Sequence, residues 1–416
     1  MTHFTTNTQM AKREIITFTN KLSQGMTRPQ KKFTADMTYG ILHSQSVLLS
    51  DIATSLKEPI RKKNLIDRLS RNLVSNIQFS KKNYDAAIQH MIPQDPIVLV
   101  DDTDIVKPFG EKFEALGLVK DGSSKNDIYE KGYHVTEMVV LSKEHQPISL
   151  FSHIHSSSEK NYSSANTVTK KGIQEVAARL GGNPTFVLDR GYDQNALLRL
   201  MYELEQTFIL RIKRNRKILH KGKWLSADTL CASRKGKLRT QVMIQGEWKT
   251  VYLSHLNVQI TASRKNVYLV LVYGIGEHPM MLATNRPLKG KDDVVKVTRD
   301  YLSRWRIEEY FRFKKQGFGF ENMRVRSIRA MNCLNTLLTY AITFLALIKH
   351  KKHTHKLKVC VMEHADPLRK NVLFYYYQMA KGISSVLSHA RTGIKKYYKA
   401  LRKRDPQVSF RFLNAL

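Results

Sequence analysis

The sequence predicts a mixed α/β protein whose main sheet is interrupted by a β-rich insertion and flanked by helical regions. Three observations support this fold class. Between residues 91 and 214, short apolar runs that end in carboxylates alternate with helical patterns. Residues 215–285 show short alternating segments separated by glycines, which is typical of strands. Both ends of the chain have helical spacing of their apolar residues.

The composition indicates a polyanionic partner. The chain has 416 residues, of which 42% are hydrophobic, so it is long enough for several domains with ordinary cores. Lys and Arg number 69 against 35 Asp and Glu, which leaves a formal net charge of +34. We therefore expect nucleic acid as the partner, with an anionic membrane surface as the weaker alternative.

No segment predicts membrane insertion or export. The longest apolar run, residues 333–348, is interrupted by Asn and Thr and is too short to span a bilayer, so it predicts a buried helix. The first residues lack a basic stretch followed by an apolar one. Cys231, Cys333 and Cys360 are widely separated, which favours a reducing cytoplasm over a disulfide framework or zinc site.

The N-terminal region, residues 1–90, predicts a helical DNA-binding region. A first helix would begin at Ser50, and Pro59 would separate it from a basic helix over residues 60–73. The basic side chains of that second helix make it a candidate DNA reader: Arg61, Lys62, Lys63, Arg68 and Arg71. A solvated basic helix without a DNA partner is the alternative.

The core begins with a buried strand at residues 97–100, which we expect to end at Asp101 and Asp102. Asp189 follows the fourth expected strand. The elements in order are strands at 132–141 and 146–153, a helix at 164–180, a strand at 185–188, a helix at 195–205 and a strand at 208–213. We expect Asp104 and Asp193 to be loop or capping residues.

A helix is expected from Lys291 to Gln316. At about 100° per residue, Tyr301, Arg304, Glu308 and Lys315 fall within a sector of roughly 60°. One interpretation is a surface ion pair between residues four apart. The other is a metal-binding carboxylate flanked by cations that bind phosphate.

Three carboxylates on separate elements suit phosphodiester cleavage, because two Mg²⁺ ions bound by acidic oxygens can stabilise both the attacking and the leaving oxygen. Asp101, Asp189 and Glu308 provide such a set if the first and fourth strands are neighbours. If the first strand continues, Asp102 points to the face opposite Asp101. His134, His153 and His155 alternate along strands, and we expect them to have structural or DNA-facing roles.

The spacing Y-x2-R-x3-E-x6-K of Tyr301, Arg304, Glu308 and Lys315 resembles the signature of bacterial insertion-sequence transposases of the DDE type. Asp101-Asp102-Thr103 and Asp189-Arg190-Gly191 resemble the first-acid and second-acid motifs of that family. The resemblance covers about residues 95–330. It implies a ribonuclease H-like catalytic domain and a cut-and-paste DNA transposase.

The resemblance also implies roles for single residues. Asp101, Asp189 and Glu308 would hold two Mg²⁺ ions, for which Mn²⁺ would substitute. Tyr301, Arg304 and Lys315 would grip DNA phosphates, and Arg190 would orient Asp189 or contact phosphate. Trp248 or Trp224 would stack on an unpaired base, unless it is a core residue of the insertion. Pairing two element ends implies at least a dimer on DNA.

The expected organisation is an N-terminal region (1–90), a core in two parts (91–214 and 286–348), the insertion (215–285) and a basic helical C-terminal region (349–416). Two other functions are compatible with parts of this pattern. A non-catalytic DNA-binding protein would explain the charge but not the three acids. A ribonuclease H-like nuclease without strand transfer would explain the acids but not the insertion.

Overall fold

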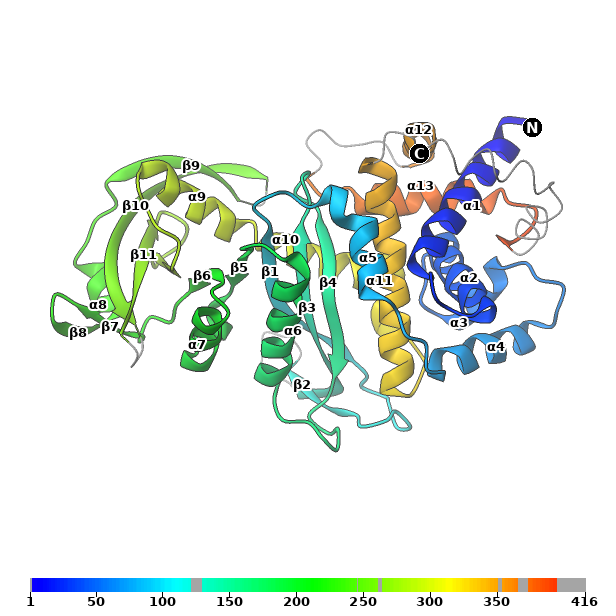
Figure 1. Cartoon of the computed structure of the whole chain (residues 1–416), viewed down its shortest axis with the longest axis horizontal. Coiled ribbons are helices and arrows are strands. Elements are labelled where there is room, and N and C mark those ends of the chain that lie inside the picture. The colour runs from blue at the N-terminus through cyan, green and yellow to red at the C-terminus, as the bar shows by residue number, and fades with distance from the viewer. Residues whose placement is uncertain are drawn as a thin grey trace. The chain divides into compact units, whose positions relative to one another are not determined.

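The computed structural model describes residues 2–120, 129–244, 246–260, 264–350, 354–365 and 373–394. The chain divides into two compact units (Figure 1). The first takes in Met1–Met91, Lys107–Leu116 and Arg312–Leu416, and the second takes in Ile92–Val106 and Gly117–Phe311. The basic stretches expected at 351–353 and 395–399 lie outside the described residues.

Five strands of the second unit form the ribonuclease H-like part of the sheet, which confirms the predicted fold class. They are β1 (Ile97–Val106), β3 (Tyr129–Leu141), β4 (Pro147–His155), β5 (Thr185–Leu188) and β6 (Thr207–Arg211). β3 pairs antiparallel with both β1 and β4, while β5 is parallel to β1 and β6 is parallel to β5. The first and fourth of these strands are therefore neighbours.

The parallel pair β1 and β5 lies at the centre of the unit. Val98, Val100 and Phe186 are fully buried, as expected for runs that are apolar on both faces. β1 nevertheless continues to Val106, because β3 pairs with it along its whole second half. The expected strand end at Asp101 was therefore wrong, and Asp104 is a strand residue rather than a loop or capping residue.

Helix α6 (Ala165–Leu180) packs on β3 and β4, and α7 (Asn195–Glu203) follows β5 (Figure 1). Ser164 caps the start of α6, and Gly181 ends it with a φ of +61°, a conformation that favours glycine. Inside α6, a Cβ at Gly172 would come within 2.6 Å of the Met138 side chain. Gly172 therefore allows the helix to approach the sheet closely.

The insertion contributes strands to the same sheet. Its elements are β7 (Lys217–His220), β8 (Lys223–Ser226), α8 (Ala227–Ala232), β9 (Leu238–Ile244), β10 (Glu247–Ile260), β11 (Lys265–Tyr273) and β12 (Met280–Thr284). β10 pairs with β7, β9 and β11, and β12 joins β11 to β6. At the opposite edge, β2 (Gly117–Lys120) pairs with β3.

The single helix expected from Lys291 to Gln316 was wrong. The structure has α9 (Lys291–Leu302), α10 (Trp305–Arg312) and a π-helical turn at Phe313–Gly317. At the break, the amides of Arg304 and Ile307 donate to carbonyls only three residues back, and the Ser303 hydroxyl donates to the carbonyl of Asp300. These tighter turns interrupt the α-helical ladder, so the sector calculated for one straight helix does not apply.

The first unit is helical. Its described helices include α1 (Thr2–Leu22), α2 (Arg28–Ser44), α5 (Lys81–Ile88), α12 (His355–Glu363) and α13 (Tyr376–Ser388). Among the described residues, α11 (Ile328–His350) is long and apolar enough to cross a membrane by length and composition alone, but 83% of its most apolar window is buried inside the protein. The prediction of a buried helix there is confirmed.

The two helices expected near Pro59 exist as α3 (Leu49–Ser55) and α4 (Lys62–Val74), so the first begins one residue before Ser50. α4 buries Leu65, Leu69 and Leu73. On its other face Arg68 pairs with Asp36 and Glu58. Arg68 therefore forms ion pairs inside the unit, which corrects its expected role as a DNA reader. The other side chains predicted to read DNA are exposed: Arg61, Lys62, Lys63 and Arg71.

Candidate active site

Two of the predicted acids lie side by side on neighbouring strands, Asp101 within β1 and Asp189 directly after β5. Val100 of β1 is the register partner of Leu188 of β5. Asp101 and Asp189 are the next residues along the two parallel strands, so both carboxylates emerge side by side. Arg190 and the short 3-10 turn at Arg190–Tyr192 then lead the chain away from the sheet.

The guanidinium of Arg304 connects the strand acid to the helix acid. Its Nη1 lies 2.9 Å from Oδ2 of Asp101, and its Nη2 lies 2.5 Å from Oε1 of Glu308. The side chains of Arg304 and Asp101 are largely shielded, with 18% and 22% of their surfaces exposed, whereas that of Glu308 is 49% exposed. The interpretation of Arg304 and Glu308 as a simple surface ion pair is thus incomplete, because Arg304 also binds Asp101 of β1.

Tyr301 completes the cluster from the end of α9. Its hydroxyl donates to Oδ1 of Asp189 at a distance of 2.9 Å. α9 itself is held against β5 by Arg286, which donates to Asp300 at 2.7 Å and to the hydroxyl of Thr185 at 2.6 Å. Four elements, β1, β5, α9 and α10, therefore position the three predicted acids.

The two strand acids have opposite pKa shifts. Burial raises the pKa of Asp101 to about 7, although Arg304 and the amide of Asp102 act to lower it. Burial also acts to raise the pKa of Asp189, but Arg304, the amide of Arg190 and the Tyr301 hydroxyl outweigh it, so the pKa is lowered. Near neutral pH, Asp189 is charged while Asp101 titrates.

The donor set fits a hard divalent cation, since it consists of three carboxylates from separate elements. Within the described parts of the chain, no three His, Cys, Asp or Glu residues already surround a common point suitable for a metal ion. In this arrangement the guanidinium of Arg304 joins Asp101 to Glu308.

A family model described as "Transposase DDE domain" matches residues 92–344 of this sequence. The chain belongs to this transposase family. A cryo-EM structure titled as a piggyBac transposase synaptic complex with hairpin DNA is also similar, with 9% sequence identity over 97% of this chain and 86% of that chain and a TM-score of 0.41. No match was found among curated proteins.

Four more residues of the transposase were predicted to bind DNA. Lys315 belongs to the first unit, where its ammonium lies 3.0 Å from Oε1 of Glu321. Trp248 and Trp224 are 62% and 47% exposed, so the alternative that they are core residues of the insertion was wrong. Arg190 has an exposed side chain, and its amide bonds to Asp189.

The DDE domain also contains a polar row that the sequence did not reveal as a unit. Nδ1 of His134 lies 2.8 Å from Oδ1 of Asp104, and the hydroxyl of Thr136 lies 3.0 Å from Nε2 of His155. The bond to Asp104 raises the pKa of His134, while burial lowers that of His155 to about 4. These contacts support the structural role expected for the histidines.

Sequence reasoning missed Arg286 and the link from Arg304 to Asp101. The motif spacing indicated that Arg304 and Glu308 meet, because they are four residues apart. Nothing local indicated a partner 203 residues earlier in the chain. Asp193, expected to be a loop or capping residue, is a buried acceptor for the amide of Lys213.

Proposed function

We propose that this chain is a DNA transposase that binds the terminal inverted repeats of a mobile element, cuts the DNA ends by metal-dependent hydrolysis and joins the 3′-hydroxyl ends to target DNA. The observation that carries the proposal is the convergence of Asp101, Asp189 and Glu308 on one cationic group inside the family-matched region. The net charge of +34 supports a polyanionic substrate.

Asp101, Asp189 and Glu308 would hold two Mg²⁺ ions, with Mn²⁺ as a substitute. When bound, such ions supply charge stabilisation to the attacking and leaving oxygens of the phosphodiester. The residues contribute mainly by positioning: Tyr301 holds Asp189 through its hydroxyl, and Arg286 holds α9 in place. No covalent protein intermediate is required for such chemistry.

Arg304 has a second part in the proposal. Its guanidinium pairs with Asp101 and Glu308, which would otherwise repel each other. The planar donors of the guanidinium are also well suited to a DNA phosphate, so Arg304 would contact a phosphate near the cut. Joining two ends also implies that the protein acts as a dimer on DNA.

The test is the substitution Glu308→Gln, with Glu309→Gln as the matched control on the same helix. The substrate is DNA that carries the repeats flanking the gene, and the readouts are strand cleavage with Mg²⁺, joining to a plasmid, and DNA binding. We expect Glu308→Gln to lower cleavage by at least about 100-fold without weakening DNA binding, and Glu309→Gln to retain activity.

Three results would overturn the proposal in different ways. Normal cleavage by the Glu308→Gln protein would remove the acid from the catalytic set. Cleavage by the wild-type protein without any joining would indicate a nuclease. Binding without cleavage in either divalent ion would indicate a DNA-binding protein that does not cut.

A further inference from the structure

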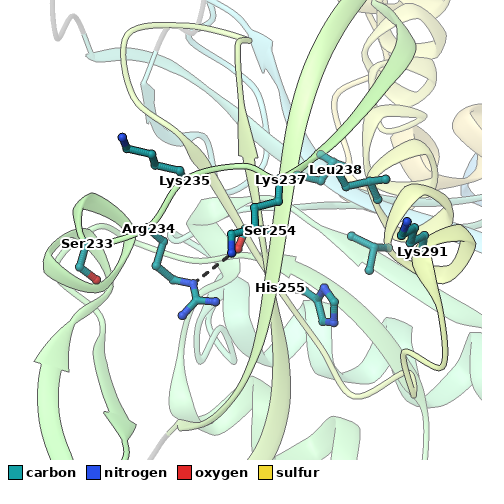
Figure 2. Close-up of a pocket in the computed structure, with 10 residues that line it drawn as sticks. Ser233, Arg234, Lys235, Lys237, Leu238, Ser254, His255 and Lys291 are labelled. Atoms are coloured by element: carbon teal, nitrogen blue, oxygen red, sulfur yellow. Dashed lines mark hydrogen bonds between the residues drawn. The ribbon is translucent and has the colours of Figure 1, made fainter.

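The insertion contains a cavity of about 760 Å³ that none of the predicted site residues lines. Figure 2 shows it between the segment after α8, the middle of β10 and the beginning of α9. Its floor includes the apolar side chains of Leu238, Leu253 and Val294. Its remaining lining consists of the hydroxyls of Ser233 and Ser254, the imidazole of His255 and four cations: Arg234, Lys235, Lys237 and Lys291.

Within the described parts of the chain, the cations of this pocket form no pair with a carboxylate, although Asp292 and Asp293 follow Lys291 in the sequence. No carboxylate is among the lining residues, and in the described parts of the chain none of the four Lys and Arg side chains forms an ion pair. Arg234 instead donates to the hydroxyl of Ser254 at 3.5 Å (Figure 2). Like charges gathered in one hollow repel each other, so the arrangement favours a bound anion.

The backbone that carries these cations is held firmly. The hydroxyl of Tyr273 lies 3.2 Å from the carbonyl oxygen of Arg234, and the amide of Lys237 donates to the carbonyl of Leu253 at 2.9 Å. Between them, a Cβ at Gly236 would come within 2.6 Å of the Tyr252 backbone. The backbone of the segment is thus anchored to β10 and β11, which fixes the positions from which the cationic side chains extend.

We propose that this pocket, lined by Arg234, Lys237 and Lys291, binds backbone phosphate of the element's DNA end. This inference rests on the proposed transposase function. The ligand is DNA rather than RNA because the proposed function acts on DNA ends, and the apolar side chains of the lining suit the carbon-rich deoxyribose.

The position of the pocket along α9 indicates which phosphates it binds. Lys291 is the first residue of α9, Tyr301 lies in its last turn, and Arg304 lies two residues past its end, beside the acids. At 1.5 Å per residue, these 10 to 13 positions span roughly 15 to 20 Å. For DNA that runs parallel to α9, at 3.4 Å per nucleotide, the bound phosphate would lie about four to six nucleotides from the cut.

The test combines the substitutions Lys237→Ala and Lys291→Ala, since both side chains are exposed and come from different elements. Lys265→Ala is the matched control, because Lys265 is an exposed cation of the same insertion outside the pocket. We expect the double variant to reduce the salt slope of end binding by about 0.9 for each phosphate that it no longer neutralises, and the control to leave the slope unchanged.

Neutral methylphosphonate linkages placed singly along the end DNA locate the bound phosphate. We expect a methylphosphonate linkage about four to six nucleotides from the cut to weaken DNA binding by the wild-type protein but not by the double variant. An equal effect on both proteins would overturn the inference, as would equal competition by RNA of the same sequence. Failure of the wild-type protein to bind end DNA would overturn the proposed function itself. If the wild-type protein binds and the double variant shows the same salt slope, only the role proposed for the pocket is refuted.

Discussion

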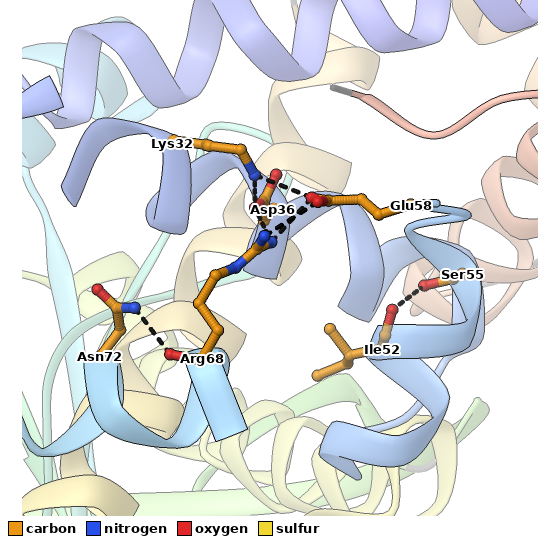
Figure 3. Close-up of polar contacts among 7 residues, drawn as sticks. All are labelled: Lys32, Asp36, Ile52, Ser55, Glu58, Arg68 and Asn72. Carbon is orange, nitrogen blue, oxygen red and sulfur yellow. Dashed lines mark hydrogen bonds and ion pairs between the residues drawn. The ribbon is translucent and has the colours of Figure 1, made fainter. Parts of the chain in front are cut away.

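The substitution Arg68→Met tests the buried charge network of the first unit (Figure 3). Asp36 and Glu58 have only 2% and 1% of their side chains exposed, and both accept from Arg68 and Lys32. Arg68 makes a two-pronged contact with Glu58, at 2.8 and 2.9 Å, and a third bond to Asp36 at 3.1 Å. Its loss leaves two buried carboxylates with one half-exposed cation between them.

Removing one partner of a buried pair typically costs about 3 to 5 kcal/mol. We expect Arg68→Met to lower the free energy of unfolding by about 3 kcal/mol, the lower end of this range, because Lys32 still reaches both acids. The measurement is urea denaturation followed by circular dichroism. Adding Glu58→Gln should recover part of the loss, since it removes one of the two buried charges.

Arg71→Met is the control for this prediction. Arg71 lies on the same helix, is exposed, and donates only to the carbonyl of Asp67 at 3.3 Å. A surface change of this kind is expected to alter stability by no more than about 0.5 kcal/mol. Equal effects of Arg68→Met and Arg71→Met would refute the reasoning, since they would show that the network contributes nothing beyond an exposed arginine.

Two further predictions concern pH and DNA. Burial lowers the pKa of Lys107 to about 8 from 10.5, so between these values the unfolded chain binds more protons and the free energy of unfolding rises with pH. Between about pH 8 and pH 10, the free energy of unfolding of the wild-type protein, measured by urea denaturation, should rise by about 2 kcal/mol more than that of Lys107→Met. Parallel pH profiles of the two proteins would contradict this. Trp248→Ala should weaken binding to ends with unpaired bases by about 1 to 3 kcal/mol in a fluorescence anisotropy titration, whereas Trp248→Phe should retain most of it. Unchanged affinity in Trp248→Ala would exclude stacking.

Local patterns were sufficient for much of the fold. The apolar runs at the start of β1 and throughout β5 are buried on both faces, so the existence of these two strands and the position of an acid directly after each run could be predicted, although the end of β1 could not. The cap at Ser164 and the stop at Gly181 likewise depend on neighbouring residues only. The same holds for the spacing of Tyr301, Arg304 and Glu308, from which the family resemblance was inferred.

By itself the sequence determined the α/β class, the three acids and the basic character of this protein, because periodicity, charge and motif spacing are properties of short segments. Only the tertiary structure decided that β1 continues past Asp101, that the helix breaks at Ser303, and that Arg68 turns inward to two acids. It also decided that Arg304 joins Asp101 to Glu308. These outcomes depend on partners distant in sequence, whose pairing is set by the packing of whole elements rather than by the residues on either side.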